Sequence, residues 1–240
     1  MGISAMIYKR KSTRSYTGEP VREEILEKIR AFASQLRLLY PDIPVIAEIL
    51  PRERFQSILP WLPPQAVAVY TKEGAEALEN VGFACQQLEL YLQSLGLGVC
   101  WVGLARLKKP EPRQDSLRYG IMLCFGYPKE QPLREFISDF KRKPLEEISD
   151  RADARLEPAR LAPSSVNSQP WYFTHEGDML HVYCSLSGFL RKKALGDMNL
   201  IDIGIALGNL YVANPDTFRF YRVENTTSIK GYQYIGSFTL

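Results

Sequence analysis

The chain has 240 residues, of which 45% are hydrophobic and 24% charged, and this ordinary globular composition excludes a disordered chain. Thirty Lys and Arg against 27 Asp and Glu leave a formal net charge of +3, too small to indicate nucleic-acid binding. No apolar run approaches the roughly 18 to 20 residues of a membrane span, and the N-terminal sequence lacks the apolar stretch of a secretory signal. Four widely spaced cysteines and two histidines argue against a zinc site or a disulfide scaffold, so buried thiols and a cytoplasmic location are expected.

Two helices are predicted in the first half of the chain. Residues 22–38 carry apolar side chains at the spacing of one buried stripe. Residues 71–95 carry so many apolar side chains that this longer helix should be mostly buried, and Gly96 and Gly98 are expected to end it. Runs rich in β-branched and aromatic residues predict strands. These strands cover residues 66–71, 121–125, 179–184, 218–223 and 232–238.

Gly82 and Gly204 lie in matching patterns, in which every matched pair is 122 positions apart. The patterns are Asn80-Val81-Gly82-Phe83-Ala84 with Leu88, and Asp202-Ile203-Gly204-Ile205-Ala206 with Leu210. A Pro-x-(x)-Glu-Glu-Ile element also recurs at nearly the same offset. Chance matching of helix-favouring residues is the alternative to a duplicated unit. In a duplicated unit, the two glycines would let equivalent helices cross closely, as at the twofold axis of a dimer fused into one chain.

A dense basic segment lies close to the N-terminus, at residues 9–14 with the sequence Lys-Arg-Lys-Ser-Thr-Arg. Four cations and two hydroxyls in six residues are donors suited to phosphate oxygens, which arginine can bind in a bidentate manner. A solvated basic tail is the alternative. Nucleic-acid binding is a weaker third reading, because no second basic stripe with interleaved aromatic residues accompanies the segment.

A second polar segment covers residues 162–171, Ala-Pro-Ser-Ser-Val-Asn-Ser-Gln-Pro-Trp. Two prolines restrict the backbone at both ends, which predicts an ordered loop. Its hydroxyl and amide groups suit a polar heterocycle or a sugar chain better than a metal, and Trp171 is expected to supply a flat apolar wall. A generic turn leading into a strand is the alternative.

Four motifs are spread over both halves of the chain. They are Arg-x-Ser-x-Arg at residues 10–14, Gly-Leu-Gly at residues 96–98, Gly-Tyr-Pro at residues 126–128, and the Ala-Pro-Ser-Ser-x-Asn-x-Gln-Pro-Trp string at residues 162–171. Together they resemble the nitroreductase family of flavin enzymes, and the last string is the specific part of the match. In ordinary members each motif occurs once per subunit, and each flavin site combines the first segment of one subunit with the Pro-Ser-Ser segment of its partner.

This chain departs from that pattern in both halves. Residues 33–36, Ala-Ser-Gln-Leu, stand where the first half would carry Pro-Ser-Ser, and the second half has no Arg-x-Ser-x-Arg before its loop. The resemblance is therefore to the tandem, single-chain branch of the family. It implies an α+β fold with mixed sheets flanked by helices, in which halves 1–128 and 129–240 form an internal pseudo-dimer with one complete site.

The resemblance also assigns residues to an FMN site. Arg10 and Ser12 would hold the phosphate end, and Arg14 would lie near the pyrimidine edge of the ring. The residues that would line the flavin from the other half are Pro163, Ser164, Ser165, Asn167 and Gln169. The backbone at Val102 and Gly103 would face flavin N5. Lys141, Arg142 and Lys143 would form a second basic arm, although this run could equally be a solvated stretch before a helix.

The function that the resemblance implies is FMN-dependent oxidoreduction, with hydride passing from NADH or NADPH to flavin N5 and then to a small-molecule acceptor such as a nitroaromatic or a quinone. The cofactor carries this chemistry, so no catalytic side chain is assigned, and His175 and His181 are expected to be surface or strand residues. A flavin-binding protein without turnover and an interaction module with a basic tail are the alternatives. No nucleic acid, membrane or metal is expected as a partner, and the chain is expected to act as a monomer.

Overall fold

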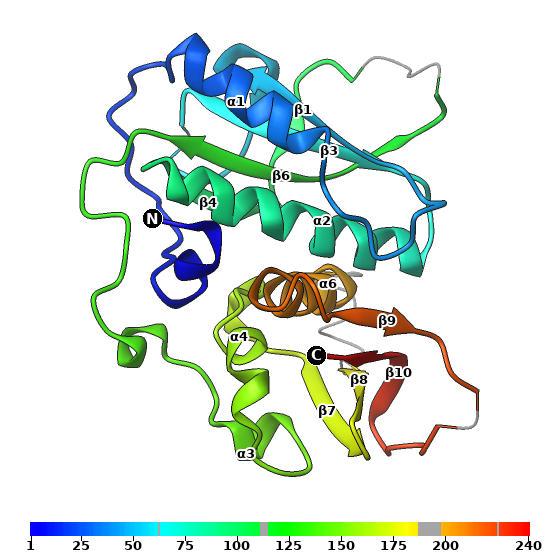
Figure 1. Cartoon of the computed structure of the whole chain (residues 1–240). Helices are drawn as coiled ribbons and strands as arrows, with labels where there is room; N and C mark the ends of the chain where they lie inside the picture. Colours follow the sequence, from blue (N-terminus) through cyan, green and yellow to red (C-terminus); the bar gives the residue numbers. More distant parts are fainter. Residues whose placement is uncertain (62, 111–114, 187–197, 225) are drawn as a thin grey trace.

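The computed structural model describes residues 1–61, 63–110, 115–186, 198–224 and 226–240. Two four-stranded sheets form the outer layers of the molecule, and two long helices, α2 (Ala75–Ser94) and α6 (Met198–Ala213), pack against each other between them (Figure 1). The largest buried apolar cluster draws on both sheets and both helices, so the two halves share one continuous core.

The two halves have the same order of strands around their central helix. In the first half, β1 (Val45–Pro51) and β3 (Gln65–Thr71) precede α2, while β4 (Gly98–Val102) and β6 (Arg118–Gly126) follow it. In the second half, β7 (Trp171–Glu176) and β8 (Met179–Ser185) precede α6, while β9 (Arg219–Tyr221) and β10 (Tyr232–Thr239) follow it. The strand orders are β1-β3-β6-β4 and β7-β8-β10-β9, so the same topology occurs twice.

Glycines allow α2 and α6 to cross with their backbones in contact, as expected. A Cβ atom on Gly82 would lie 2.0 Å from the carbonyl oxygen of Ile201, and a Cβ on Gly204 would lie 2.0 Å from the carbonyl oxygen of Glu79. Any side chain other than hydrogen would overlap the partner helix at these two positions. The crossing depends on both glycines.

The described strands bear out the five predicted from sequence and add others that sequence reasoning missed. The missed ones are β1, β4, β7, β2 (Phe55–Gln56) and β5 (Arg106–Leu107). The expectation of mixed sheets needs a correction, because all ladders between the described strands are antiparallel. Parallel pairing occurs only as isolated bridges in the described part, Ser12–Val99 and Ser149–Phe173.

The first predicted helix is shorter than expected. Helix α1 spans Glu23–Ala33 and ends five residues before the predicted end. Side chains of α2 bind the backbone that follows: Arg37 N donates to Gln87 Oε1 at 3.1 Å, and Leu39 N donates to Asn80 Oδ1 at 2.7 Å. Since these N–H groups are used by α2, the chain leaves the helix.

Helix α2 is mostly buried, as predicted, and begins after Gly74 rather than at Thr71, which ends β3. Gly96, with φ +82°, follows its last turn, and Leu97 N donates to Leu92 O at 3.2 Å across it. Gly98 plays another part: it opens β4, where a Cβ would lie 2.5 Å from Thr13. Gly96 therefore ends the helix, and Gly98 makes room for the N-terminal segment.

Short elements complete the described part of the chain. They are the 3-10 helices η1 (Ile3–Tyr8), η2 (Arg52–Arg54), η3 (Ile137–Phe140), η4 (Ala154–Leu156) and η5 (Ser165–Asn167), and the helices α3 (Leu145–Ile148) and α4 (Glu157–Arg160). All four cysteines are buried free thiols, as expected. Among the described helices, none combines the length and apolar character needed to cross a membrane. Among all the residues that the structure describes, no group of three or more His, Cys, Asp and Glu side chains is placed to hold a metal.

Candidate functional site

A cleft of about 830 Å³ lies where three segments far apart in the sequence meet. These are the N-terminal segment, the connection between β6 and α3, and the Pro-Ser-Ser loop of the second half. Figure 1 shows the N-terminal segment beside α2, between the two halves, and the connection passing down one side of the molecule. The cleft is lined by Arg10, Lys11, Ser12, Arg14, Gln131, Leu133, Arg134, Glu135, Phe136, Asp139, Phe140, Lys141, Arg142, Pro163, Ser164, Val166 and Asn167.

Backbone pairing fixes the N-terminal segment in the cleft. Thr13 N donates to Val99 O at 2.8 Å, and Ser12 forms a parallel bridge with Val99 on the edge strand β4. On its other side Arg10 forms an antiparallel bridge with Leu133. The segment is thus held between β4 and the β6–α3 connection, and it is not a solvated tail.

Arg10 is a buried residue with a buried partner. Its side chain is 1% exposed, and its Nε donates to Glu89 Oε1 of α2 at 2.9 Å. Glu89, 0% exposed, also accepts hydrogen bonds from Gln86 and Gln93. Nη2 of Arg10 donates to Ser12 Oγ at 3.0 Å. Each of the two buried charges therefore has an opposite charge beside it, as buried Arg and Glu side chains need.

The Pro-Ser-Ser loop has an unusual backbone. Val166, Asn167 and Gln169 have φ values of 47°, 57° and 49°. Asn tolerates the left-handed region, but Gln169 and above all the β-branched Val166, which is 74% exposed at the cleft, do not favour it. Strain of this kind gathers at functional sites, where the surrounding structure enforces it.

Asp202 of α6 holds this loop in place. Both carboxylate oxygens lie 3.0 Å from the backbone nitrogen of Ser165, which donates to them. Burial raises the pKa of Asp202 to about 7, against the lowering effect of the hydrogen bonds from Ser165 and Ser168. Gln169 N donates to Ser164 Oγ at 2.9 Å and closes the turn.

Side-chain hydrogen bonds join the Lys-Arg-Lys run to the Pro-Ser-Ser loop. Arg142 Nη1 donates to Asn167 Oδ1 at 2.5 Å, and Asn167 Nδ2 donates to Lys141 O at 3.1 Å. Arg142 Nε donates to Ala162 O at 2.9 Å, and Lys143 N donates to Gln169 Oε1 at 2.8 Å. Two segments that the sequence separates by some twenty residues therefore form one wall of the cleft.

Positive charge is concentrated in the cleft. Burial, followed by the nearby guanidinium groups of Arg10 and Arg134, lowers the pKa of Arg142 to about 9. Burial and the Arg10 charge likewise lower the pKa of Arg134 to about 10. In the described part of the chain, neither Arg134 nor Arg142 has a carboxylate at ion-pair distance. Guanidinium groups that repel one another without acidic partners favour an anion between them.

Most residues expected in the site lie in this cleft, and some do not. Those that line it are Arg10, Ser12, Arg14, Lys141, Arg142, Pro163, Ser164 and Asn167. Three expected residues do not line the cleft but form hydrogen bonds that hold the loop: Lys143, Ser165 and Gln169. Val102 and Gly103 are not part of the lining: a Cβ on Gly103 would lie 2.6 Å from Met198, at the start of α6.

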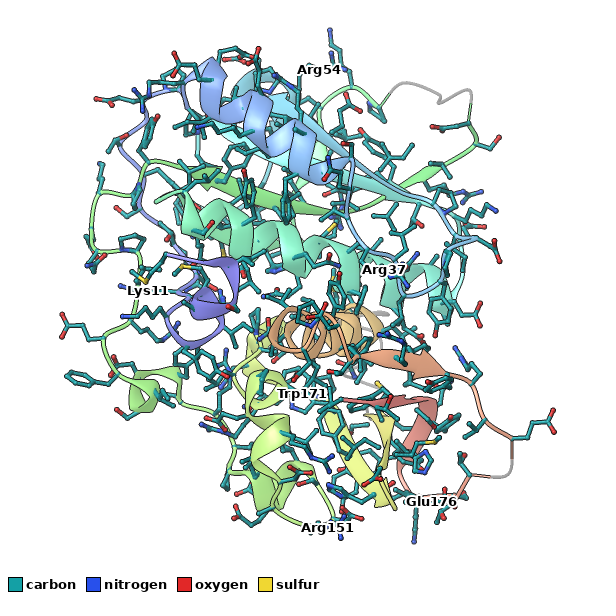
Figure 2. The ribbon with its side chains drawn as sticks, in the orientation of Figure 1. Lys11, Arg37, Arg54, Arg151, Trp171 and Glu176 are labelled. Carbon is teal, nitrogen blue, oxygen red and sulfur yellow. The ribbon has the colours of Figure 1, made fainter. Side chains whose placement is uncertain are left out.

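Trp171 does not supply the expected wall of the site. It is buried at the start of β7, and Figure 2 shows it inside the second half while Lys11 lies at the level where the halves meet. The alternation of side chains along a strand explains this, because Trp171 and Phe173 point to the same inner face. The histidines are strand residues, as expected: His175 is in β7 and His181 in β8.

In the β6–α3 connection, only Lys141, Arg142 and Lys143 were expected in the site, and the contribution of residues 131–140 was missed. Arg134 and Phe140 line the cleft with the Arg134 guanidinium carbon 4.4 Å from the Phe140 ring centroid, and Phe136 lines it while 65% exposed. An Arg followed at short spacing by two Phe residues was the available signal. Three residues are too few to establish a helical or strand period, and so this pattern carried no prediction.

The counterpart of the Pro-Ser-Ser loop in the first half is also not where it was expected. Asn80 lies 122 positions before Asp202, and its side chain binds the backbone of residues 39–43: Leu39 N donates to Oδ1 at 2.7 Å, and Nδ2 donates to Ile43 O at 2.7 Å. Asp202 binds Ser165, which lies 122 positions after Ile43. In a duplicated unit, the loop that matches the Pro-Ser-Ser loop would therefore be residues 39–43, because residues 33–36 are the end of α1 and the turn after it.

Comparisons with known proteins agree on one family. The family model described as "Putative TM nitroreductase" matches residues 2–214. No curated protein matches the chain. A crystal structure of a Thermotoga maritima protein described as a nitroreductase is similar with a TM-score of 0.65 and 18% identity, and the match covers 99% of this chain and 92% of that one.

Two further solved structures match over a smaller part of this chain. A nitroreductase family protein of Clostridium difficile is 21% identical, with a TM-score of 0.48, and the match covers 62% of this chain and 96% of that one. A Desulfovibrio desulfuricans protein solved in complex with FMN is 16% identical, with a TM-score of 0.47, and covers 64% and 98%. The fold follows from the Thermotoga maritima structure, and the family follows from the family model that matches most of the sequence. The chain belongs to the nitroreductase family.

Proposed function

We propose that this chain is an FMN-dependent oxidoreductase that binds FMN in the cleft, takes electrons from NADH or NADPH, and passes them to a small-molecule acceptor such as a nitroaromatic or a quinone. One observation carries the proposal: the N-terminal segment and the Pro-Ser-Ser loop, from opposite halves of the chain, line a single cleft that is rich in unpaired guanidinium groups. Membership of the nitroreductase family supports it.

The donors in the cleft fit FMN. Its phosphate carries negative charge and needs strong donors, which Arg134 and Arg142 supply without acidic partners of their own. The hydroxyls of Ser12 and Ser164 fit the polar ribityl chain. Phe136 is exposed at the cleft and offers an apolar surface for a flat ring. A cleft of about 830 Å³ lies within the range of roughly 300 to 1,000 Å³ for small-molecule sites.

FMN, when bound, supplies two-electron transfer of the kind that accepts and releases hydride. The chain would supply position and charge. Arg14 is exposed and lines the cleft, so its guanidinium would stabilise negative charge on the pyrimidine edge of the ring. The strained Pro-Ser-Ser loop, fixed by Asp202 and by Arg142, would hold one face of the ligand in a single orientation. No side-chain nucleophile is needed.

We infer that the chain is a fused pseudo-dimer with halves 1–128 and 129–240. The repeated strand order, the 122-residue offset between α2 and α6 and the matched contacts of Asn80 and Asp202 support this. The loop at residues 39–43 carries neither Pro-Ser-Ser nor the hydroxyls of its counterpart, so one complete site per chain is expected.

The purified protein tests this proposal. We expect it to be yellow, to release FMN on denaturation, and to lose its visible flavin absorbance when NADH or NADPH is added without oxygen. The absorbance should return when a quinone or a nitroaromatic is added. A yellow protein that neither nicotinamide bleaches would be a flavin-binding protein without turnover. A colourless protein that gains no flavin from added FMN would contradict the proposal altogether.

A further inference from the structure

We propose that Arg134, acting with Arg142, binds the FMN phosphate in this chain, whereas Arg10 is a positioning residue held in a buried ion pair with Glu89. This inference rests on the proposed function, because it needs FMN to bind in the cleft. It reassigns the part that the Arg-x-Ser-x-Arg motif gave to Arg10, and it gives a role to a residue that no motif contains.

Arg10 is poorly placed to act as a free cation. Its side chain is almost fully buried, and its Nε is 2.9 Å from the carboxylate of Glu89, which is also buried. Its Nη2 is engaged by Ser12 Oγ at 3.0 Å. The carboxylate of Glu89 offsets part of the charge that Arg10 would present to an anion in the cleft. Its effect is to fix the backbone of the segment that carries Ser12 and Arg14.

Arg134 differs from Arg10 in being only partly buried and in having no ion-pair partner among the described residues. Its Nε donates to Asp139 O at 3.1 Å, and its Nη1 donates to Arg10 O. Both acceptors are backbone carbonyls, so the guanidinium is oriented without an ion pair, and the two carboxylates whose charges act on it, Asp139 and Glu89, lie beyond ion-pair distance. Its Nη2 has no hydrogen-bond partner among the described residues. The ring of Phe140 supports one face of the group, with the guanidinium carbon 4.4 Å from the ring centroid.

Arg142 is held in a similar way, beside the Pro-Ser-Ser loop. Its Nε and Nη1 donate to Ala162 O, Phe140 O and Asn167 Oδ1 at 2.5 to 2.9 Å. Its Nη2, like that of Arg134, has no hydrogen-bond partner in the described part of the chain. The Arg142 guanidinium carbon also lies over the Phe140 ring, at 5.9 Å from the centroid. Two oriented guanidinium groups around one phenyl ring, each with an Nη2 to spare, match the several acceptor oxygens of a phosphate dianion.

The backbone places Arg134 beside the N-terminal motif. Arg134 N donates to Lys9 O at 2.7 Å, next to the bridge between Arg10 and Leu133. The β6–α3 connection therefore brings its own cation to the place where the motif alone predicts Arg10. Arg134 and Arg142 are both partly buried, and this arrangement, together with the lowered pKa of each, agrees with a site that an anion would stabilise.

The test compares FMN with riboflavin, which has the same ring and ribityl chain but no phosphate. Flavin fluorescence gives the dissociation constant of each for wild type, Arg134→Gln and the control Arg151→Gln. Arg151 is exposed, and Figure 2 shows it at the far end of the second half from Lys11. For Arg134→Gln we expect FMN affinity to fall about ten-fold to a hundred-fold, the loss of one charge-assisted hydrogen bond, with riboflavin affinity unchanged. Arg151→Gln should behave as wild type.

A second pair of variants keeps the outcome clear if Arg134→Gln folds poorly. Arg134→Lys retains the charge and should recover part of the FMN preference. Glu89→Gln frees the charge of Arg10 and should leave the preference of FMN over riboflavin equal to or greater than that of wild type. A wild-type preference in Arg134→Gln, or a preference lost in Glu89→Gln, would overturn the inference in favour of Arg10. If wild type binds neither flavin, the proposed function fails instead, and the two failures are distinguishable.

Discussion

Gly82 and Gly204 face each other's helices at one crossing, and their contacts are reciprocal. A Cβ atom on Gly82 would fall on the carbonyl of Ile201, and one on Gly204 would fall on the carbonyl of Glu79, both at 2.0 Å. Glu79 and Ile201 are 122 positions apart, as are the two glycines. Each helix thus uses the same residue to contact the same part of the other. This is the pattern of an isologous interface within a single chain.

We predict that Gly82→Ala and Gly204→Ala each lower the free energy of unfolding by about 3 kcal/mol or more, because the new methyl overlaps backbone that cannot rotate away. The two losses should be similar in size. Gly120→Ala is the control, since its Cβ would lie 3.7 Å from Val69 O, an ordinary contact. Urea unfolding measures all three. A Gly82→Ala or Gly204→Ala protein as stable as Gly120→Ala would show that the helices can separate without cost.

The buried pair of Arg10 and Glu89 predicts strong coupling between two side chains. Arg10→Leu and Glu89→Leu should each cost about 3 to 5 kcal/mol, because each leaves one buried charge without its partner. The double variant should lose clearly less than the sum of the two. Arg118 and Glu73 form the matched control, an ion pair whose side chains are 71% and 70% exposed. Its double-mutant cycle should give a coupling between about 0 and 1 kcal/mol. Equal coupling in both cycles would contradict this account.

Two carboxyl groups predict that the protein is more stable at mildly acidic pH. Burial raises the pKa of Asp202 and of Glu79 to about 7 in the folded chain, above the usual values of 3.8 and 4.5. Between about pH 4 and pH 7 the folded chain therefore holds more protons than the unfolded chain, and stability falls as pH rises through this window. Asp153 has a lowered pKa, and its contribution is lost only at pH values below this window.

The measurement for this effect is the free energy of unfolding at pH 5.5 and at pH 8. Wild type should be more stable at pH 5.5, and Asp202 alone can account for about 2 kcal/mol of the difference, because pH 5.5 lies about 1.5 units below its pKa in the folded chain. Asp202→Asn should reduce the difference, because its amide does not titrate. A wild type that gains stability from pH 5.5 to pH 8 would contradict the prediction.

The sequence predicted the parts of the fold that depend on local patterns. Helix α2, with its apolar residues and Gly96, and the five strands rich in β-branched residues were all predictable. The end of α1 was not, because it depends on Asn80 and Gln87, side chains of α2 that lie far along the chain. Strand β4 was not predictable in this way, because it begins at Gly98, and a glycine just after a helix indicates the end of that helix rather than the start of a strand.

In the candidate site, too, local motifs were predictable from the sequence and tertiary contacts were not. The motifs located two of the three segments that line the cleft, because each motif has a fixed spacing. They could not reveal that Glu89 forms an ion pair with Arg10, since a glutamate within a helical run has no special spacing, nor that Arg134 lies beside Arg10. Both contacts form only when the chain folds and brings distant segments together. Residues 187–197, between β8 and α6, lie outside the described residues and carry no prediction here.

Arg14 provides a prediction about the electron-transfer properties of the site. If it lies at the pyrimidine edge of FMN, its charge stabilises the reduced ring more than the oxidised ring and raises the reduction potential. Arg14→Gln should then lower the midpoint potential by on the order of 20 mV, the equivalent of about 1 kcal/mol for a two-electron couple. Spectroelectrochemical titration measures this. A variant that binds FMN more weakly at an unchanged midpoint would place Arg14 at the phosphate instead.

The most direct test of the account is the number of FMN molecules that one chain binds. The cleft needs the Arg-x-Ser-x-Arg segment of the first half and the Pro-Ser-Ser loop of the second, and each occurs once. Apo-protein of known concentration is titrated with FMN and followed by flavin fluorescence, with the mass of the protein in solution measured alongside. The account predicts saturation at one FMN per 27.4 kDa chain, with no dimer required for binding. Saturation at two equivalent sites per chain, or no saturable binding, would contradict it.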